Sequence, residues 1–325
     1  MKIIVTGATG SLGGAIVRHL AKKGHQIIAC GTLPEPPKEL QNIADYLEID
    51  ITGTFELPDA DVCIHAAALS DDKAAYPDLH KTNVDGTLNV MKATTNCPHF
   101  VYVSSSSVYV PSPELLTEED AGGTKKIKLS LYGKSKWAAE NLIRQNPMHK
   151  HIDILRPRAL YGPGDKMILP RMLKMEKNGA LQVPGGLIAK ISMTHYENFN
   201  HALDLCLATP KAGIRTYNIS DSNSYVLIDV MRKFTRSFYG KTLPEKKTPI
   251  ALLKFLAVFQ IGGITPLLVR SLTNDMVLNI DKIKTELGYN PKVTLDNSLP
   301  ELKTWVEKVG GPEQLKSGDK SFAWK

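Results

Sequence analysis

Tyr132 and Lys136 stand four residues apart in the segment SLYGKSKWAAE, at the start of a predicted helix. Side chains at positions i and i+4 share one face of a helix, so this phenol and this ammonium can point into the same cleft. A phenol has a pKa of about 10, but a nearby positive charge favours the phenolate and can lower that pKa by roughly 2 to 4 units. The pair is therefore suited to general acid–base catalysis near neutral pH.

Four serines run from 104 to 107, directly after an apolar stretch that predicts a strand. Open α/β sheets bind their ligands at the carboxyl ends of the strands, so a serine hydroxyl there can hold a substrate oxygen. Taken singly, the Tyr–Lys pair is typical of an ordinary amphipathic helix start, and the serines of a hydrogen-bonded loop. Their combination with the glycine loop at the start of the chain favours a catalytic site.

Three glycines, Gly7, Gly10 and Gly13, separate the first predicted strand from the first helical pattern in IIVTGATGSLGGAIVRHL. In such a loop the first glycine permits the tight turn, and the helix N-terminus presents backbone N–H groups to a pyrophosphate. The position within a strand–helix–strand unit favours dinucleotide binding over a simple tight turn. We therefore expect cofactor contacts from Gly7, Thr9, Gly10, Ser11, Leu12 and Gly13.

The end of the second predicted strand bears on the choice of cofactor. Proteins that bind NAD usually carry an acidic residue there, about 20 residues beyond the glycines, which binds the ribose diol. This chain has Gly31 and Thr32 at that place, and the nearest basic residues are Lys38 and Arg18. No carboxylate would repel a 2′-phosphate, so we predict NADP(H) or NAD(H) as the cofactor and favour NADP(H).

Apolar stretches at 3–6, 26–29, 46–49, 62–65, 100–103 and 152–155 alternate with helical patterns. Strands buried on both faces and separated by helices predict an α/β fold: a doubly wound parallel (Rossmann) sheet with a second, smaller α/β substrate domain. The segment YNISD at 217–221 predicts a strand that returns to the main sheet. We expect a dinucleotide-binding domain at 1–165, with a returning segment near 195–222, and a substrate-binding domain at 166–194 and 223–325.

Composition argues against several classes of protein. The net charge is +7 over 325 residues, but lysine and arginine never run longer than two, so no nucleic-acid partner is expected. Cys30, Cys63 and Cys206 lie in apolar stretches, which predicts buried free thiols in a reducing compartment, the cytoplasm. The first strand begins at once, so we expect no signal peptide, and no histidine triplet is spaced to bind a metal.

The motifs of this chain resemble those of the extended short-chain dehydrogenase/reductase family over nearly its whole length. They are TGATGSLG at 6–13, HAAA at 65–68, TNVDGT at 82–87, SSSSVY at 104–109, YGKSK at 132–136 and LRPRALYGPGD at 155–165. The resemblance implies an enzyme in which Ser105 orients the substrate oxygen, Tyr132 is the acid–base, and Lys136 tunes Tyr132 and holds the nicotinamide ribose. It further implies cofactor contacts from Asp50, Ile51, Ala66, Ala67, Ala68, Ser104, Tyr132, Lys136 and Pro157, and a structural role for Asn83.

Several segments bear on the branch of this family. Dehydratases carry Asp-Glu after the catalytic hydroxyl, where this chain has Ser106 and Ser107, and nucleotide-sugar epimerases usually carry an Arg-Asp pair where it has Lys190 and Ile191. The segments ISMTHYENFNHA and LTNDMVLNIDKIKTELGYNP instead resemble the 3β-hydroxysteroid dehydrogenase-like branch. That resemblance implies an NAD(P)-dependent oxidoreductase that interconverts a secondary alcohol and a ketone on a hydrophobic substrate, of the 3β-hydroxysteroid or β-hydroxy/β-keto acyl type.

Two alternatives stay open. A nucleotide-sugar 4-epimerase would use the same catalytic set but needs a clamp for the diphosphate, and a non-catalytic dinucleotide-sensing regulator would commonly lack the Tyr–Lys pair. The apolar segment 249–272 is interrupted by Lys254 and Pro266, so it predicts no membrane span. It can be a lid over an apolar substrate, a peripheral contact with a membrane surface, or core of the second domain. A homodimer is also expected.

Overall fold

The computed structural model describes residues 1–71, 74–124, 127–259, 261 and 264–317. Its central sheet contains β1 (Lys2–Thr6), β2 (Gln26–Gly31), β3 (Asp45–Glu48), β4 (Val62–His65), β5 (His99–Val103), β6 (His151–Pro157) and β12 (Gly213–Ile219). These seven strands lie in the order β12-β6-β5-β4-β1-β2-β3, and every neighbouring pair is parallel. The predicted doubly wound Rossmann sheet is confirmed, and β12 is the returning strand.

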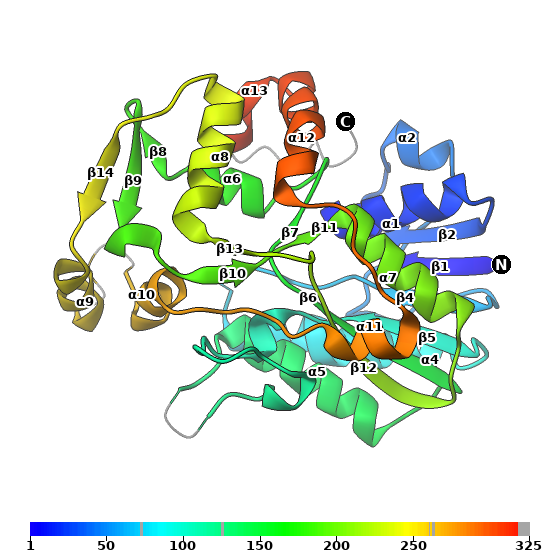
Figure 1. Cartoon of the computed structure of the whole chain (residues 1–325). Coiled ribbons are helices and arrows are strands. Elements are labelled where there is room, and N and C mark those ends of the chain that lie inside the picture. The colour runs from blue at the N-terminus through cyan, green and yellow to red at the C-terminus, as the bar shows by residue number, and fades with distance from the viewer. Residues whose placement is uncertain (72–73, 125–126, 260, 262–263, 318–325) are drawn as a thin grey trace.

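Helices cover both faces of this sheet (Figure 1). On one face lie α1 (Ser11–Lys22), α7 (Tyr196–Ala208) and α11 (Asp281–Leu287); on the other lie a π-helical turn (Lys81–Asp85), α4 (Gly86–Ala93) and α5 (Leu131–Gln145). Ile3 and Val5 of β1 pack with α1 and α7, whereas Ile4 packs on the face that α4 and α5 cover. Because successive strand residues point to opposite faces, burial on both faces explains the unbroken apolar stretches of the sequence.

A second hydrophobic core lies among elements outside the central sheet. Its helices are α6 (Ile168–Leu173), α8 (Leu227–Tyr239), α12 (Leu295–Lys308) and α13 (Gly311–Lys316). Its strands are β8 (Glu176–Lys177), β9 (Ala180–Pro184) and β14 (Glu245–Thr248), with the pair β10 (Lys190–Ser192) and β13 (Ser224–Val226). Met231 and Phe234 of α8 and Trp305 of α12 are buried in this core. We propose that it is the core of the smaller substrate domain.

Short elements connect these layers. They are α2 (Lys38–Gln41), α3 (Tyr76–His80), the strand pair β7 (Leu160–Tyr161) and β11 (Thr194–His195), and 3₁₀ turns at Ser106–Val108, Glu118–Asp120 and Gly185–Leu187. The parallel pair β7–β11 joins the segment that follows β6 to the segment that precedes α7. It therefore links the end of the central sheet to the second core.

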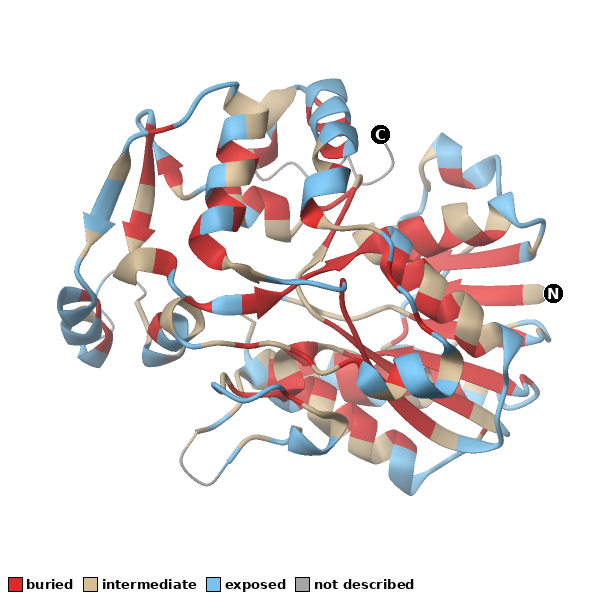
Figure 2. Ribbon diagram, viewed as in Figure 1, coloured by how far each residue is buried: buried red, intermediate tan, exposed pale blue. Residues whose placement is uncertain are grey.

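The apolar segment 249–272 forms two helices, α9 (Ile250–Val258) and α10 (Pro266–Thr273). Proline is well placed in the first turn of a helix, and Thr265 caps α10 by accepting a hydrogen bond from the backbone N–H of Leu268 at 3.1 Å. Leu253, Ala257 and Val269 form a small buried core here, and Figure 2 shows much of α9 exposed. Within the described part of the chain, we find no helix with the length and hydropathy of a membrane span.

Candidate active site

The glycine loop between β1 and α1 requires glycine for steric reasons. A side chain at Gly7 (φ +70°) would place its Cβ 2.8 Å from the backbone of Ala67, and a Cβ on Gly13 would lie 2.1 Å from the carbonyl oxygen of Gly7. The N-cap of α1 is Gly10, which has no side chain, so the N–H groups of the first turn are not taken by a capping side chain. Close backbone approach and an uncapped helix N-terminus fit the pyrophosphate of a dinucleotide.

All the residues predicted for catalysis and cofactor binding line one cleft of about 1000 Å³. They come from the carboxyl ends of β1, β4, β5 and β6 and the segments that follow them, from the start of α1, from the loop after β3 and from the start of α5. The set comprises Gly7, Thr9, Gly10, Ser11, Leu12, Gly13, Asp50, Ile51, Ala66, Ala67, Ala68, Ser104, Ser105, Tyr132, Lys136 and Pro157. The topology thus gathers residues that lie as far as 150 positions apart (157 − 7) in the chain.

The start of α5 is held tightly against the serine loop. Ser130 caps the helix by accepting a hydrogen bond from the N–H of Gly133 at 3.0 Å. A Cβ on Gly133 would lie 2.0 Å from the carbonyl oxygen of Ser107, so only glycine permits this approach. The glycine inside the YGKSK motif, to which the sequence analysis assigned no role, is therefore what brings Tyr132 next to the serines.

Lys136 is fully buried one turn after Tyr132. Its Nζ donates a hydrogen bond to the carbonyl oxygen of Val103 at 2.8 Å and lies 4.2 Å from the centroid of the Tyr102 ring. Burial lowers the pKa of Lys136 to about 7, while the carboxylate of Glu140 acts in the opposite direction. The ammonium is thus poised between its charged and neutral forms at the floor of the cleft.

The serines of the run at 104–107 have different environments. Ser105 Oγ accepts a hydrogen bond from the N–H of Ser107 and donates one to its Oγ, both at 3.1 Å, and it faces the cleft. Ser104 Oγ, in contrast, donates to Glu140 Oε1 at 2.6 Å and is buried. Of these two hydroxyls, that of Ser105 is therefore the one better placed to meet a substrate oxygen.

Asn83 lies behind the site. Its side-chain amide accepts a hydrogen bond from the N–H of Leu69 and donates to the carbonyl oxygen of Leu69 and to Ser135 Oγ, at 2.8 to 3.0 Å. Ser135 in turn donates to the carbonyl oxygen of Tyr132 at 2.8 Å. These contacts join the segment that follows β4 to the first turn of α5, so they agree with a structural role.

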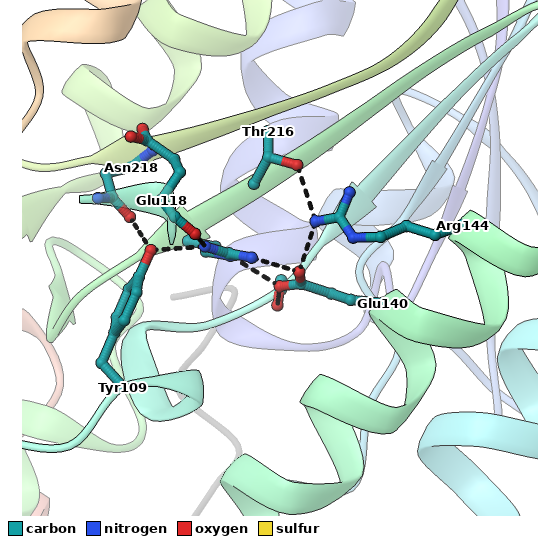
Figure 3. Close-up of polar contacts among 8 residues, drawn as sticks. Tyr109, Glu118, Glu140, Arg144, Thr216 and Asn218 are labelled. Atoms are coloured by element: carbon teal, nitrogen blue, oxygen red, sulfur yellow. Dashed lines mark hydrogen bonds and ion pairs between the residues drawn. The ribbon is translucent and has the colours of Figure 1, made fainter. Parts of the chain in front are cut away.

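A buried ionic network behind Lys136 was not predicted from the sequence (Figure 3). Glu140, fully buried on α5, accepts hydrogen bonds from Arg156 Nε at 2.9 Å and Nη2 at 2.6 Å, and from Arg144 Nη2 at 3.1 Å. Arg156 Nη1 also donates to Tyr109 Oη at 2.6 Å, and Tyr109 donates to Asn218 Oδ1 at 2.7 Å. The network therefore connects the catalytic helix to β6 and β12.

Another part of the cleft wall holds a group of apolar side chains, which we call the apolar wall, and Arg171 and Ser271 line the cleft from the same elements. The apolar side chains come from α6 and the residues just after it, from β10, from the start of α8 and from α10: Ile168, Met172, Met175, Ile191, Leu227, Leu268 and Leu272. Of the apolar segment 249–272, α10 lines the cleft, whereas the cleft-lining residues include none from the described part of α9. The sequence pattern showed an apolar segment but not which of its residues face the site.

Gly31, the last residue of β2, and Thr32, which follows it, both line the cleft. Asp50, also in the cleft, accepts hydrogen bonds from the N–H and the hydroxyl of Thr52, both at 2.9 Å, and the first of these chiefly lowers the pKa of its carboxyl. Lys38 and Arg18, the nearest basic residues in the sequence, do not line the cleft.

The fold and this site define an NAD(P)-binding Rossmann protein with a Ser–Tyr–Lys set in its cleft. The chain belongs to the NAD dependent epimerase/dehydratase family, whose model matches residues 3–220. The chain is therefore an enzyme of the extended short-chain dehydrogenase/reductase type, as predicted.

Relatives of known activity include oxidoreductases. The chain is 24% identical to a 2-alkyl-3-oxoalkanoate reductase of Stenotrophomonas maltophilia, over 93% of this chain and 98% of the relative. It is 26% identical to a decarboxylating sterol-4-alpha-carboxylate 3-dehydrogenase of Schizosaccharomyces pombe, over 94% and 98% respectively. Among solved structures, the UDP-glucuronic acid 4-epimerase of Bacillus cereus in complex with NAD matches with a TM-score of 0.76 and 22% identity, over 95% of this chain and 99% of the other.

Proposed function

We propose that this protein interconverts a secondary alcohol and a ketone on a hydrophobic substrate of the 3β-hydroxysteroid or β-hydroxy/β-keto acyl type, with NAD(P)(H) as cofactor. The observation that carries the proposal is the composition of the cleft. The cleft combines Ser105, Tyr132 and Lys136 with the apolar wall, whose side chains come from α6 and the residues after it, β10, α8 and α10. The activities of the reductase and the sterol dehydrogenase among its relatives support the same class of reaction.

In this proposal each member of the catalytic set has one role. Ser105 Oγ holds the substrate oxygen by a hydrogen bond, and Tyr132 Oη accepts the hydroxyl proton during oxidation or donates it during reduction. The positive charge of Lys136 favours the phenolate form of Tyr132, and its Nζ also binds the ribose next to the nicotinamide. The nicotinamide, when bound, accepts or supplies the hydride.

The nucleotide-sugar 4-epimerase is the weaker alternative. The likeness to the UDP-glucuronic acid epimerase is at 22% identity and concerns the fold. Lys190, which occupies the place of the usual arginine clamp, is exposed on β10 and does not line the cleft. The second alternative, a non-catalytic regulator, is disfavoured because Tyr132 and Lys136 are both retained in the cleft.

The substrate proposal predicts that activity rises with the length of an apolar chain. Burying one methylene contributes about 0.8 kcal/mol, so two more carbons should raise kcat/KM by roughly tenfold. Leu272→Asp should flatten this rise in activity with chain length, because it places a charge in the apolar wall. Leu115→Asp is the control: it changes an exposed leucine outside the cleft and should leave the rise unchanged. Absorbance of the reduced nicotinamide follows the reaction, and melting curves check that each variant is folded. Turnover of UDP-sugars with no response to apolar alcohols would instead support the epimerase.

For the cofactor, we propose that NADP(H) binds at least as tightly as NAD(H), because neither Gly31 nor Thr32 carries a carboxylate. A new charge at Thr32 should move the preference toward NAD(H) by repelling a 2′-phosphate and accepting hydrogen bonds from the ribose diol. Thr32→Asp is a better variant than Gly31→Asp, because a Cβ on Gly31 would lie 3.0 Å from the side chain of Thr9 and from Tyr46 Oη. Fluorescence titration of both reduced cofactors measures the preference. A wild-type protein that clearly prefers NADH would contradict the proposal.

We also propose that the exposed face of α9 makes peripheral contact with an anionic lipid surface. Phe255 and Phe259 are 58% and 63% exposed, and the exposed lysines Lys246, Lys247 and Lys254 lie on α9 and the strand just before it. Apolar side chains beside lysines suit the boundary between acyl chains and anionic headgroups. The double variant Phe255→Ser/Phe259→Ser should lose co-sedimentation with phosphatidylglycerol vesicles; binding to phosphatidylcholine alone, or none in the wild type, would contradict the proposal.

Two further expectations stay proposals. The cytoplasm is the expected compartment, and its support is that Cys30, Cys63, Cys97 and Cys206 are all free and buried. We also propose a homodimer, and light scattering on the purified protein would measure the mass of the assembly.

A further inference from the structure

Arg158 is a cation in the cleft without a carboxylate partner. Its side chain is partly exposed, but Nε is buried and makes no hydrogen bond, and Nη1 lies against the sulfur of Met276. Among the residues that the structure describes, no carboxylate oxygen lies within 4.0 Å of the guanidinium. Burial lowers the pKa of Arg158 to about 10, which still leaves it charged at neutral pH.

The two buried arginines of the fold, Arg156 and Arg215, are both paired with carboxylates. Arg156 forms two hydrogen bonds with the carboxylate of Glu140, at 2.6 and 2.9 Å. Arg215 forms two with Asp153, at 2.6 and 2.8 Å. An unpaired charge in a poorly hydrated place is costly, so proteins usually pair it. An arginine left unpaired in the substrate cleft therefore points to an anion that arrives with a ligand.

Arg158 is placed on the substrate side of the cleft. It follows Pro157 at the end of β6, and its backbone N–H donates to Thr194 Oγ1 at 3.1 Å. Met276, against which the guanidinium lies, is bridged to Ile191 of β10, and Ile191 lines the cleft. The guanidinium thus lies against Met276, beside the apolar wall, while Arg158 itself follows β6, the neighbour of the strand that ends in the serine loop. The glycine loop that fits the cofactor pyrophosphate follows a different strand, β1.

We propose that Arg158 binds a carboxylate of the substrate, so that the preferred substrate is the free β-hydroxy or β-keto acid of an apolar chain. This inference rests on the proposed function and names the substrate class more closely. A planar guanidinium binds a carboxylate through two parallel hydrogen bonds. A β-hydroxy acid carries its carboxylate close to the reacting hydroxyl and its apolar chain beyond it, which matches the order of Ser105, Arg158 and the apolar wall.

The test compares a medium-chain β-hydroxy acid, its methyl ester and the secondary alcohol that lacks the carboxyl group. With the wild type, we expect kcat/KM for the acid to exceed that for the ester by about 10- to 100-fold, the contribution of hydrogen bonds to a charged group. Arg158→Met should bring this ratio close to one. Arg158→Lys should keep part of the preference for the acid, because lysine retains the positive charge but lacks the planar guanidinium that binds both carboxylate oxygens. Arg236→Met, an exposed arginine on α8 outside the cleft, is the matched control.

A second measurement does not depend on turnover. Calorimetric titration with an unreactive medium-chain fatty acid should give a Kd at least about tenfold weaker for Arg158→Met than for the wild type. The melting temperature of Arg158→Met should equal or exceed that of the wild type, because an unpaired charge has been removed. A lower melting temperature with an unchanged acid-to-ester ratio would show a structural role and overturn the inference.

Three other results would overturn it. One is an acid-to-ester ratio near one in the wild type. Another is weaker NADPH binding in Arg158→Met, which would assign the guanidinium to the cofactor. The third is binding of UDP that depends on Arg158, which would assign it to a diphosphate. If none of the alcohols is oxidised at all, the proposed function fails, and the titration with the fatty acid still decides whether Arg158 binds a carboxylate.

Discussion

Replacing Tyr132 by phenylalanine is expected to lower turnover at least about 100-fold while cofactor affinity changes little. The substitution removes one oxygen atom and keeps the ring, so the start of α5 should stay packed against the serine loop. The loss follows because no other group in this proposal exchanges the proton of the substrate oxygen. Ser105 holds that oxygen, and Lys136 donates to the carbonyl oxygen of Val103 from the floor of the cleft.

Stopped-flow and steady-state absorbance of the reduced nicotinamide measure the loss, and fluorescence titration measures cofactor affinity. Tyr239→Phe is the matched control, since Tyr239 lies on α8 and donates to Glu313, outside the cleft. Near-wild-type turnover by Tyr132→Phe on a true substrate would mean that the proposed mechanism is wrong. A parallel loss of cofactor affinity would instead indicate that the ring had moved.

The parts of the fold that could be predicted are those in which one local pattern suffices. Strands buried on both faces are mostly apolar, so β1, β2, β4, β5 and β6 were visible as short apolar stretches. The glycine loop was visible because backbone approaches of 2.1 to 2.8 Å to a would-be Cβ leave no other residue possible. The same constraint at Gly133 lies inside the YGKSK motif, but its cause became clear only from the position of the Ser107 carbonyl oxygen.

The apolar wall could not be predicted, because its residues come from four stretches of the chain and no local pattern relates them. Within the apolar segment 249–272, α9 is the more hydrophobic of the two helices, yet Leu272 of α10 lines the cleft and Phe255 of α9 is exposed to solvent. Pro266 begins a second helix, and it is this second helix, α10, that lines the cleft. Hydropathy alone does not show which of the two helices meets the site.

The ionic network, in contrast, left a signal in the sequence. Arg156 stands in the apolar stretch IDILRP, and a charged residue in a strand buried on both faces needs a buried partner. Glu140 is one helical turn after Lys136 and therefore on the face of α5 that meets the sheet. The two observations together would have indicated a buried ion pair next to the catalytic helix.

Breaking the Glu140–Arg156 ion pair should have a large effect on stability. We expect Glu140→Gln to lower the free energy of unfolding by about 3–5 kcal/mol. The substitution keeps the size of the side chain but leaves the guanidinium of Arg156 without its carboxylate, inside the protein. It also removes the charge that raises the pKa of Lys136, so burial should lower that pKa further below about 7. A smaller fraction of the Lys136 side chains would then be charged at neutral pH, so the phenolate form of Tyr132 would be less favoured.

Urea unfolding measures the loss of stability, with Glu114→Gln, an exposed glutamate, as the matched control. The double variant Glu140→Gln/Arg156→Met should recover much of the loss, because it removes the uncompensated charge along with its partner. If Glu140→Gln loses less than about 1 kcal/mol of unfolding free energy, the Glu140–Arg156 pair contributes no more than an exposed salt bridge, which would contradict this prediction.

In the folded fraction of Glu140→Gln, the pH at which activity reaches half its maximum should move, because the charge on Lys136 has changed. A purely structural role for Glu140 would lower stability and leave that pH where it is in the wild type.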